Sequence, residues 1–343
     1  MQKNLKNIFL VILILIVLPV LAFGYIVGFG NLNILNPVKI ASDISKPDLK
    51  ATDGRINILI LGVDKRQQGN AVTSVLTDTV LVASIGINEK NVTLISLPRD
   101  LWVESKIGIK GKINSIYNQY DSKSGKILGP DGTKEAVEGV LGIPIHYNLT
   151  INFEVFKKII DTLGGVEVDI ENTFTDNEYP IEGKENAPMN ERYESITFTK
   201  GKEKMNGERA LKYVRSRHGQ GEEGTDFARS KRQQKVILAI KDKLMQTSTI
   251  IDLPKLKDLF DIYQKDVETN ISNEDLTKFY ALYRKINFDN FKRIVLDDRS
   301  DAESGGILYA PEDTTAYGGV YVLIPRSGDF SQIHAYVKKY LFE

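Results

Sequence analysis

The sequence contains no cysteine, which excludes thiol catalysis, disulfide bonds and metal sites built on cysteine. Its three histidines, His146, His218 and His334, are scattered without the spacing of a zinc site. Net charge is also absent, because 45 lysines and arginines balance 45 aspartates and glutamates. A general nucleic-acid binder would show a basic excess. We therefore expect no nucleic-acid partner.

One long uncharged stretch is present at residues 8–29, and Lys3 and Lys6 precede it. A run of this length spans a hydrocarbon core as a helix, and the leading lysines favour a cytoplasmic N-terminus. A cleaved signal peptide is the alternative interpretation. We expect an uncleaved, single-pass anchor in the cell membrane. Residues 1–7 are then cytoplasmic, 30–54 form an extracytoplasmic linker, and the remainder is an extracytoplasmic domain.

Three strands are predicted at residues 56–61, 80–85 and 92–97, where β-branched and aliphatic residues dominate. The short connection between the second and third strands predicts an antiparallel hairpin. If the first two strands are also antiparallel, the charged residues that flank all three lie at one edge of the sheet. These residues are expected to converge: Asp64, Arg66, Asp78, Arg99 and Asp100.

Carboxylates at such an edge, next to arginines, suit a hard cation that is bound together with phosphate oxygens. Asp64 and Asp78 are the two candidates for Mg²⁺. The competing interpretation is that both are turn residues that form local hydrogen bonds at strand ends. Pro98 supports a strand end just before Arg99, because proline cannot continue a central ladder.

A second cluster of charge surrounds a glycine-rich loop and the start of the helix that follows it. Helical spacing places Asp226, Arg229 and Gln233 on one face near the helix N-terminus, where unpaired amides favour anions. Arg215 and Arg217 precede the loop and add planar donors that suit phosphate oxygens. The pattern predicts a phosphate or pyrophosphate site. The alternative is a solvated helix face whose ion pairs stabilise little.

The other periodic segments alternate between strand and helix, which predicts a layered α/β domain. Residues 171–200 are polar and rich in turn formers, so they are expected to run over the surface. The expected helices lie at residues 133–141, 153–163, 206–214, 253–267, 274–286 and 330–342. The expected strands lie at residues 145–151, 166–170, 291–296 and 320–324.

Six segments, in order, resemble motifs of the LytR-CpsA-Psr family of cell-envelope proteins. They are residues 57–66 (NILILGVDKR), 77–85 (TDTVLVASI), 95–103 (ISLPRDLWV), 112–114 (KIN), 152–168 and 205–234. Each motif alone is weak, but six in the family's order make a specific match. The resemblance implies an α/β/α sandwich with a central mixed sheet over residues 55–343. The motifs occupy residues 55–245, and C-terminal helices and strands fill residues 246–343.

The resemblance also implies an activity. Family members transfer a glycan phosphate from a polyprenyl pyrophosphate carrier to peptidoglycan, where the glycan is a teichoic acid, a capsule or another secondary wall polymer. The implied cofactor is Mg²⁺, or Mn²⁺ in its place, held by Asp64 and Asp78. The residues that match pyrophosphate ligands are Arg99, Arg215, Arg217 and Arg229, with Arg66, Lys112, Arg232 and Gln233 as supporting candidates.

Phosphoryl transfer depends mainly on charge neutralisation and alignment. The catalytic candidates are Arg99, Asp100, Arg217, Asp226 and Arg229, and either aspartate is a candidate for taking the proton of the attacking hydroxyl. One residue departs from the family pattern, because Leu76 stands where many members have arginine. Two other functions use the same site: a polyprenyl pyrophosphate hydrolase with water as the acceptor, and a non-catalytic envelope regulator that binds polyprenyl pyrophosphates.

Overall fold

The computed structural model describes residues 49–68, 71–181, 183–184, 187–224, 226–244, 246–250, 252–283, 285–286, 291–296 and 306–343. The expected membrane span at residues 8–29 and most of the expected linker lie outside these ranges. Within them, no helix combines the length and the apolar character that crossing a membrane requires.

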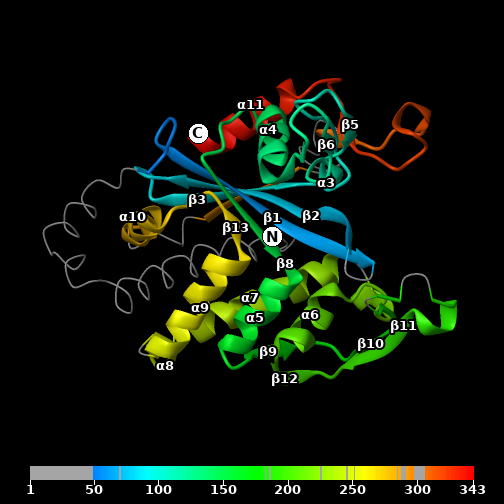
Figure 1. The fold of residues 1–343 in the computed structure, drawn as a ribbon, viewed down its shortest axis with the longest axis vertical. Coiled ribbons are helices and arrows are strands. Elements are labelled where there is room, and N and C mark those ends of the chain that lie inside the picture. Colours follow the sequence, from blue (N-terminus) through cyan, green and yellow to red (C-terminus); the bar gives the residue numbers. More distant parts are fainter. Residues whose placement is uncertain are drawn as a thin grey trace, which may run out of the picture.

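A six-stranded mixed sheet forms the centre of the molecule, in the order β13-β8-β1-β2-β3-β14 (Figure 1). The three predicted strands are its middle, and each is antiparallel to the next. Strands β8 and β14 run parallel to β1 and β3, while the short β13 is antiparallel to β8. The bounds are β1 (Arg55–Gln68), β2 (Ala71–Gly86), β3 (Asn91–Leu97), β8 (Tyr147–Asn152), β13 (Glu268–Thr269) and β14 (Phe291–Val295). The predicted mixed central sheet is confirmed.

The side chains of β1 point alternately to the two faces of the sheet, and each face has its own buried cluster. Ile56, Ile58 and Ile60 belong to one buried cluster, whereas Leu59 and Leu61 belong to the other. Successive side chains of a strand point to opposite faces, so a strand that is apolar throughout is covered on both faces. Helices supply that cover above and below the sheet (Figure 1).

Helices α3, α4 and α11 contribute to the cluster on one face, and α5, α6, α7, α9 and α10 to the cluster on the other. Asn152 caps α5 and Asn206 caps α6, each by accepting a backbone N–H of its first turn. The bounds are α3 (Ile113–Ile116), α4 (Gly129–Leu141), α5 (Phe153–Thr162), α6 (Gly207–Arg215), α7 (Asp226–Leu244), α8 (Thr247–Ile250), α9 (Leu253–Asp266), α10 (Asn273–Tyr283) and α11 (Ser331–Phe342).

Residues 171–200 lie mostly at the surface, as predicted, but they form regular structure. They contain β10 (Phe174–Pro180) and β11 (Tyr193–Phe198), which form an antiparallel ribbon. Phe174 and Phe198 on this ribbon are buried and stack with a centroid distance of 5.1 Å. Apolar contacts with the rest of the core therefore hold the ribbon in place.

The other strands form small two-stranded sheets outside the central one. Strand β9 (Val166–Ile170) was predicted, and it pairs with β12 (Gly201–Met205). The strand predicted at residues 320–324 is wrong, since only β16 (Ile324–Pro325) forms there, paired with β15 (Leu308–Tyr309). Two further pairs follow the central hairpins: β4 (Trp102–Glu104) with β5 (Lys110–Lys112), and β6 (Tyr120–Asp121) with β7 (Lys126–Ile127).

Candidate functional site

The hairpin of β1 and β2 has an irregularity at Asp78. Gly62 faces Thr79 across the hairpin, but the next residue of β1, Val63, faces Thr77. Asp78 is the extra residue of β2 at this step, as in a β-bulge. Bulges bend a strand and redirect the extra side chain, and they are common beside functional sites. The Asp78 side chain is accordingly exposed at a point where its neighbours are covered.

Asp64 follows this step in β1, and its Cα partner is Leu76. Both Asp64 and Asp78 therefore lie inside long strands. The prediction that the first strand ends before Asp64 and that the second begins after Asp78 was wrong, and so was the alternative that both are turn residues. The β1–β2 hairpin continues past the other strands of the central sheet. It places the backbones of Asp64 and Asp78 next to each other at the bulge. The side chains of Asp64 and Arg66 lie outside the described part of the structure.

A chain of charges joins the predicted residues of β2, of the turn after β3 and of β5. The Nη1 atom of Arg99 lies 3.1 Å from Oδ1 of Asp78, and its Nε lies 3.4 Å from Oδ2 of Asp100. The Nζ atom of Lys112 donates to Oδ1 of Asp100 at 2.7 Å. The predicted convergence is thus found for Asp78, Arg99 and Asp100, and Lys112 is added to it.

Backbone hydrogen bonds fix the turn that carries Arg99. Leu101 N–H donates to Pro98 O at 3.1 Å, and Asn114 N–H donates to Arg99 O at 3.3 Å. The Thr77 hydroxyl, beside Asp78 on β2, donates to Asn114 O at 3.2 Å. Strand β2, the turn and the start of α3 are therefore linked through main-chain atoms, so the charged side chains start from fixed positions.

Burial and neighbouring charge have opposite effects on the pKa of Arg99. Partial burial alone would lower the pKa of its guanidinium, but Asp78 and Asp100 together raise that pKa above its ordinary value. The arginine is consequently a permanent positive charge at this point. An exposed, fixed cation of this kind suits a phosphate oxygen.

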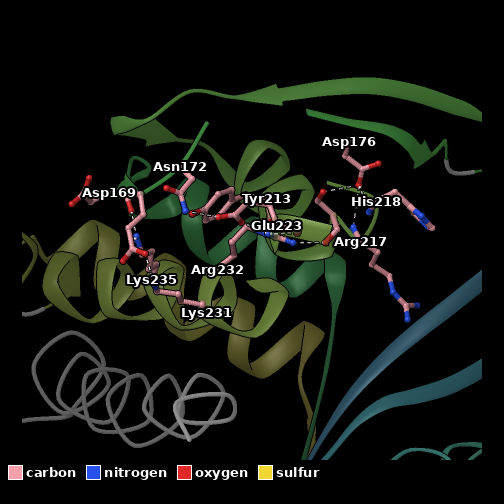
Figure 2. A network of polar contacts seen from close by, with 12 residues as sticks. Asp169, Asn172, Asp176, Tyr213, Arg217, His218, Glu223, Lys231, Arg232 and Lys235 are labelled. Carbon is pink, nitrogen blue, oxygen red and sulfur yellow. Dashed lines mark hydrogen bonds and ion pairs between the residues drawn. The ribbon is translucent and has the colours of Figure 1, made fainter. Parts of the chain in front are cut away.

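The second predicted cluster begins where α6 ends, at Arg215. The Arg215 guanidinium lies 4.5 Å from the ring centroid of Phe153, the first residue of α5. Stacking of this kind restricts the side chain without occupying its in-plane N–H donors. Arg217 follows after one buried serine and is exposed. In Figure 2 its side chain extends from the loop toward the side where the blue strands β1 and β2 run.

A buried aspartate holds the loop that carries Arg217 (Figure 2). Asp176 of β10 is 1 % exposed, and its Oδ2 accepts three hydrogen bonds. The donors are Ser216 Oγ at 2.6 Å, Arg217 N at 3.0 Å and His218 N at 3.2 Å. Burial alone would raise the pKa of Asp176, but these donors and Glu178 N–H hold it below its ordinary value. Asp176 therefore stays charged and fixes the Arg217 backbone.

A buried arginine holds the same loop from the other side. Arg232 of α7 is 2 % exposed and donates to Ser216 O at 2.6 Å and Tyr213 O at 3.1 Å. It also donates to Glu223 through both the backbone and the side chain, at 2.9 and 2.8 Å. All three guanidinium nitrogens are thus directed at protein acceptors. The structure places Arg232 as a positioning residue, which disagrees with its predicted contact with pyrophosphate.

Sequence reasoning missed Asp176, because it lies in the segment interpreted as a surface run. The sequence contained one signal for it. Asp176 is two residues after Phe174, and in a strand two such residues point to the same face, so an aspartate would lie beside an apolar ring. The remaining predicted residues of this region lie on the first turns of α7, where Arg229 is half-buried. The side chains of Asp226 and Gln233 lie outside the described part.

The described carboxylates provide part of a metal site. Among the described residues, no group of three or more histidine, aspartate or glutamate side chains could hold an ion. Asp78 fits part of a Mg²⁺ site, because its carboxylate is 40 % exposed and lies at the bulge where the backbone of Asp64 runs alongside. Mg²⁺ commonly takes one or two carboxylates and completes its shell with water and substrate phosphates. The exposed Asp78 carboxylate is therefore suited to be one ligand of such an ion.

Comparisons with known proteins identify the family and the fold. The sequence model of the LytR_cpsA_psr family matches residues 33–318. The polyisoprenyl-teichoic acid–peptidoglycan teichoic acid transferase TagU of Bacillus licheniformis is 30 % identical over 266 residues, which cover 77 % of this chain and 75 % of that protein. The regulatory protein MsrR of Staphylococcus aureus is 29 % identical over 257 residues, or 74 % and 68 % of the two chains.

Among solved structures, TagV of B. subtilis aligns with a TM-score of 0.55 at 25 % identity, and the alignment covers 85 % of this chain and 98 % of that one. An α/β fold with a central mixed sheet therefore has known counterparts. The chain belongs to the LytR_cpsA_psr family. The resemblance drawn from six sequence segments is confirmed.

Proposed function

We propose that this protein is a glycopolymer phosphotransferase, which moves a glycan phosphate from a polyprenyl pyrophosphate carrier to a hydroxyl of peptidoglycan. The observation that carries the proposal is the connected set of charges formed by Asp78, Arg99, Asp100 and Lys112 in a chain of this family. The name of TagU, a relative that is 30 % identical, supports the choice of donor and acceptor.

The donor pyrophosphate is negatively charged, and its transfer requires that this charge be neutralised and the reacting atoms aligned. Arg99 and Lys112 supply fixed positive charge from the sheet edge, and Arg217 supplies it from the loop that Asp176 holds. Arg215 and Arg229 are further ligands in this proposal. Since backbone contacts preset Arg99 and Arg217, little reorganisation of these two arginines is needed when the donor binds.

Asp78, together with Asp64, would hold Mg²⁺, which would neutralise the phosphoryl oxygens and the leaving phosphate. Mn²⁺ takes similar oxygen ligands and is an alternative ion. In this arrangement Asp78 has two partners, because its Oδ1 already meets Arg99. Asp78 would thereby hold both Arg99 and the ion, and each would supply positive charge to the pyrophosphate.

The reaction exchanges one phosphorus–oxygen bond for another. A sugar hydroxyl of peptidoglycan attacks the glycan-bearing phosphorus, and the bond to polyprenyl phosphate breaks. The hydroxyl proton passes to a carboxylate, for which the sequence offers Asp100 and Asp226. Both oxygens of Asp100 already contact cations. We therefore assign Asp100 to holding Arg99 and Lys112 in place, and Asp226 to accepting the proton.

The proposal places the domain outside the cell membrane, anchored by the uncharged stretch at residues 8–29. A single span with a cytoplasmic N-terminus keeps the site near the bilayer that contains the lipid carrier. The name of MsrR favours one competing function, a regulator that binds polyprenyl pyrophosphates without turnover. Leu76 is relevant to that alternative, because it faces Asp64 where many family members have arginine.

The test is a transfer assay with the full-length chain, Mg²⁺, a polyprenyl pyrophosphate-linked sugar and peptidoglycan fragments. Mass spectrometry of the fragments measures covalently attached glycan phosphate. The proposal predicts attachment by the parent chain and its loss in Arg217→Ala. Release of polyprenyl phosphate without attachment would instead establish a hydrolase. Binding of the lipid with neither product would establish the regulator.

A further inference from the structure

An aromatic surface continues the chain of charges. Strand β4 begins at Trp102, the single tryptophan of the sequence, directly after the turn that carries Arg99 and Asp100. Trp102 and Lys112 are Cα partners in the β4–β5 ribbon. Directly opposed residues place their side chains on the same face of a ribbon. Because Lys112 is ion-paired with Asp100, the indole lies beside the charged cluster.

The C-terminal part of the chain supplies a second ring. Tyr317 ends the 3₁₀ turn η4 (Thr315–Tyr317) and meets Trp102 edge to face, with ring centroids 5.2 Å apart and an interplanar angle of 82°. Two backbone hydrogen bonds attach this segment to the site. Trp102 N–H donates to Leu323 O at 2.9 Å, and Leu323 N–H donates to Asp100 O at 2.9 Å. The backbone of Asp100 therefore fixes the charged cluster and the aromatic pair together.

The turn after Tyr317 exposes apolar groups to solvent. Gly318 and Gly319 have φ angles of 71° and 74°, and a β-carbon on either would meet no atom within 4 Å. The turn thus projects from the fold. Val320 and Tyr321 follow it and are 43 % and 57 % exposed. These two adjacent side chains therefore present apolar surface to solvent.

We propose that Trp102, Tyr317, Val320 and Tyr321 bind a sugar strand of the peptidoglycan acceptor. This inference rests on the proposed function and names the site at which the acceptor is held. A pyranose ring has C–H groups on its faces and hydroxyls around its edge. Aromatic faces carry negative charge density that attracts such C–H groups, and rings with few rotatable bonds lose little conformational entropy on binding.

The order of groups along the surface supports a sugar strand over a purely apolar partner. Aromatic groups lie at one end, and the ionic side chains of Lys112, Asp100 and Arg99 lie at the other. A strand bound on the rings would extend its hydroxyls toward the ionic end. That end is where the proposed donor phosphate is bound, so one acceptor hydroxyl would arrive beside the phosphorus that it attacks.

The single tryptophan makes the proposal testable without turnover, since all indole fluorescence of the chain comes from Trp102. The full-length protein is titrated with a soluble peptidoglycan tetrasaccharide that carries no peptide. We expect a saturable change in the fluorescence. Tyr317→Ala and Tyr321→Ala should each weaken the affinity by about fivefold. Tyr193→Ala is the matched control, because Tyr193 is a 39 % exposed tyrosine on the β10–β11 ribbon and should bind as the parent does.

A parent chain that shows no saturable change would overturn the inference, and so would Tyr321→Ala binding with the affinity of the parent. Circular dichroism checks that each variant folds, and Tyr321→Ala is the safer substitution because the side chain is exposed. A second readout separates this inference from the proposed function. In the transfer assay, Tyr321→Ala should raise KM for the acceptor and leave KM for the lipid donor unchanged. Absence of transfer with intact sugar binding would contradict the proposed function alone.

Discussion

Arg99 Nη1 and Asp78 Oδ1 lie 3.1 Å apart across a sequence separation of 21 residues. The pair joins the bulge of β2 to the turn after β3, and both ends are exposed, at 42 % for Arg99 and 40 % for Asp78. An exposed pair of this kind adds little to folding stability. Its placement, where β2 and the turn after β3 meet, is the reason that we propose a role in binding for it.

Removal of the Asp78 carboxylate is expected to abolish activity while leaving the fold intact. Asp78→Asn should lower transfer by about a hundredfold or more, because it removes the proposed metal ligand and one partner of Arg99. The free energy of unfolding should change by less than about 1 kcal/mol, as measured by urea denaturation. Addition of a chelator to the parent chain should reproduce the loss of transfer.

The matched control for this variant is Glu135→Gln. Glu135 forms an ion pair with Lys106 at 2.9 Å, and the two side chains are 41 % and 42 % exposed. This pair resembles that of Asp78 and Arg99 in exposure but lies outside the proposed site. Transfer by Glu135→Gln should equal that of the parent. An equal loss in both variants would show that the effect of Asp78 is not specific to the site.

Asp100 is expected to act by positioning cations. Its two oxygens contact Lys112 at 2.7 Å and Arg99 at 3.4 Å, so Asp100→Asn should displace both and raise KM for the lipid donor about tenfold. Asp226→Asn should instead lower kcat with little effect on KM. Steady-state kinetics measures kcat and KM for the lipid donor in both variants and the parent. A fall of kcat in Asp100→Asn at unchanged KM would reverse the two assignments.

The sequence predicted the middle of the sheet well, because continuous aliphatic runs in β1, β2 and β3 determine buried strands without help from distant segments. The prediction from sequence failed where the burial of a side chain depends on contacts between distant segments. Phe174 and Phe198 are single aromatic residues among polar ones, and only their mutual stacking makes the ribbon part of the core. A local pattern does not contain that information.

The same distinction applies to the site. Arg99 and Arg217 were identified from charge and motif, since exposed cations next to a strand end or a helix start point to anions. The charge of Arg232 gave no indication that it is buried, because sequence does not show which arginine has backbone carbonyls around it. The contact of Asp176 with the Arg217 loop joins residues 41 positions apart and follows only from the folded chain.

Asp176 is expected to make the stability of the protein depend on pH in the acid range. The pKa of Asp176 is lower in the folded protein than in the unfolded chain. When the pH falls below about 3.9, the ordinary pKa of an aspartate, the unfolded chain therefore binds more protons than the folded protein. The stabilisation is present above about pH 4 and is lost as pH falls through the lower folded-state pKa. Urea denaturation between about pH 2 and pH 7 should therefore show a smaller acid loss in Asp176→Asn.

The Asp176→Asn variant also tests how the Arg217 loop is held. Because Arg217 donates its backbone N–H to Asp176, the variant should weaken donor binding even at neutral pH. Thr175→Ala is the control on the same strand, since Thr175 is half-buried on the ribbon and its hydroxyl forms a hydrogen bond with the Thr197 hydroxyl instead of with the Arg217 loop. An acid profile of Asp176→Asn that matches the parent would contradict the assignment of Asp176 as a charged anchor.

Arg232→Met should destabilise the fold strongly. It leaves the buried Ser216 O without its donor and removes the cation from Glu223, whose side chain is only 19 % exposed, which together cost about 3 kcal/mol. Arg209→Met is the comparison, because Arg209 also pairs with a glutamate, Glu203 at 2.6 Å, but is 31 % exposed. That variant should cost about 1 kcal/mol or less. Equal unfolding free energies for the two variants would contradict the positioning role of Arg232.

The central claim is that the charges around Arg99 form the pyrophosphate site. Isothermal titration of the full-length chain with a short-chain polyprenyl pyrophosphate, with and without Mg²⁺, tests it most directly. The account predicts that Mg²⁺ tightens binding and that Arg99→Ala raises Kd at least tenfold, about 1.4 kcal/mol, while Lys106→Ala binds as the parent does. Arg99→Ala with the Kd of the parent, both with and without Mg²⁺, would contradict it.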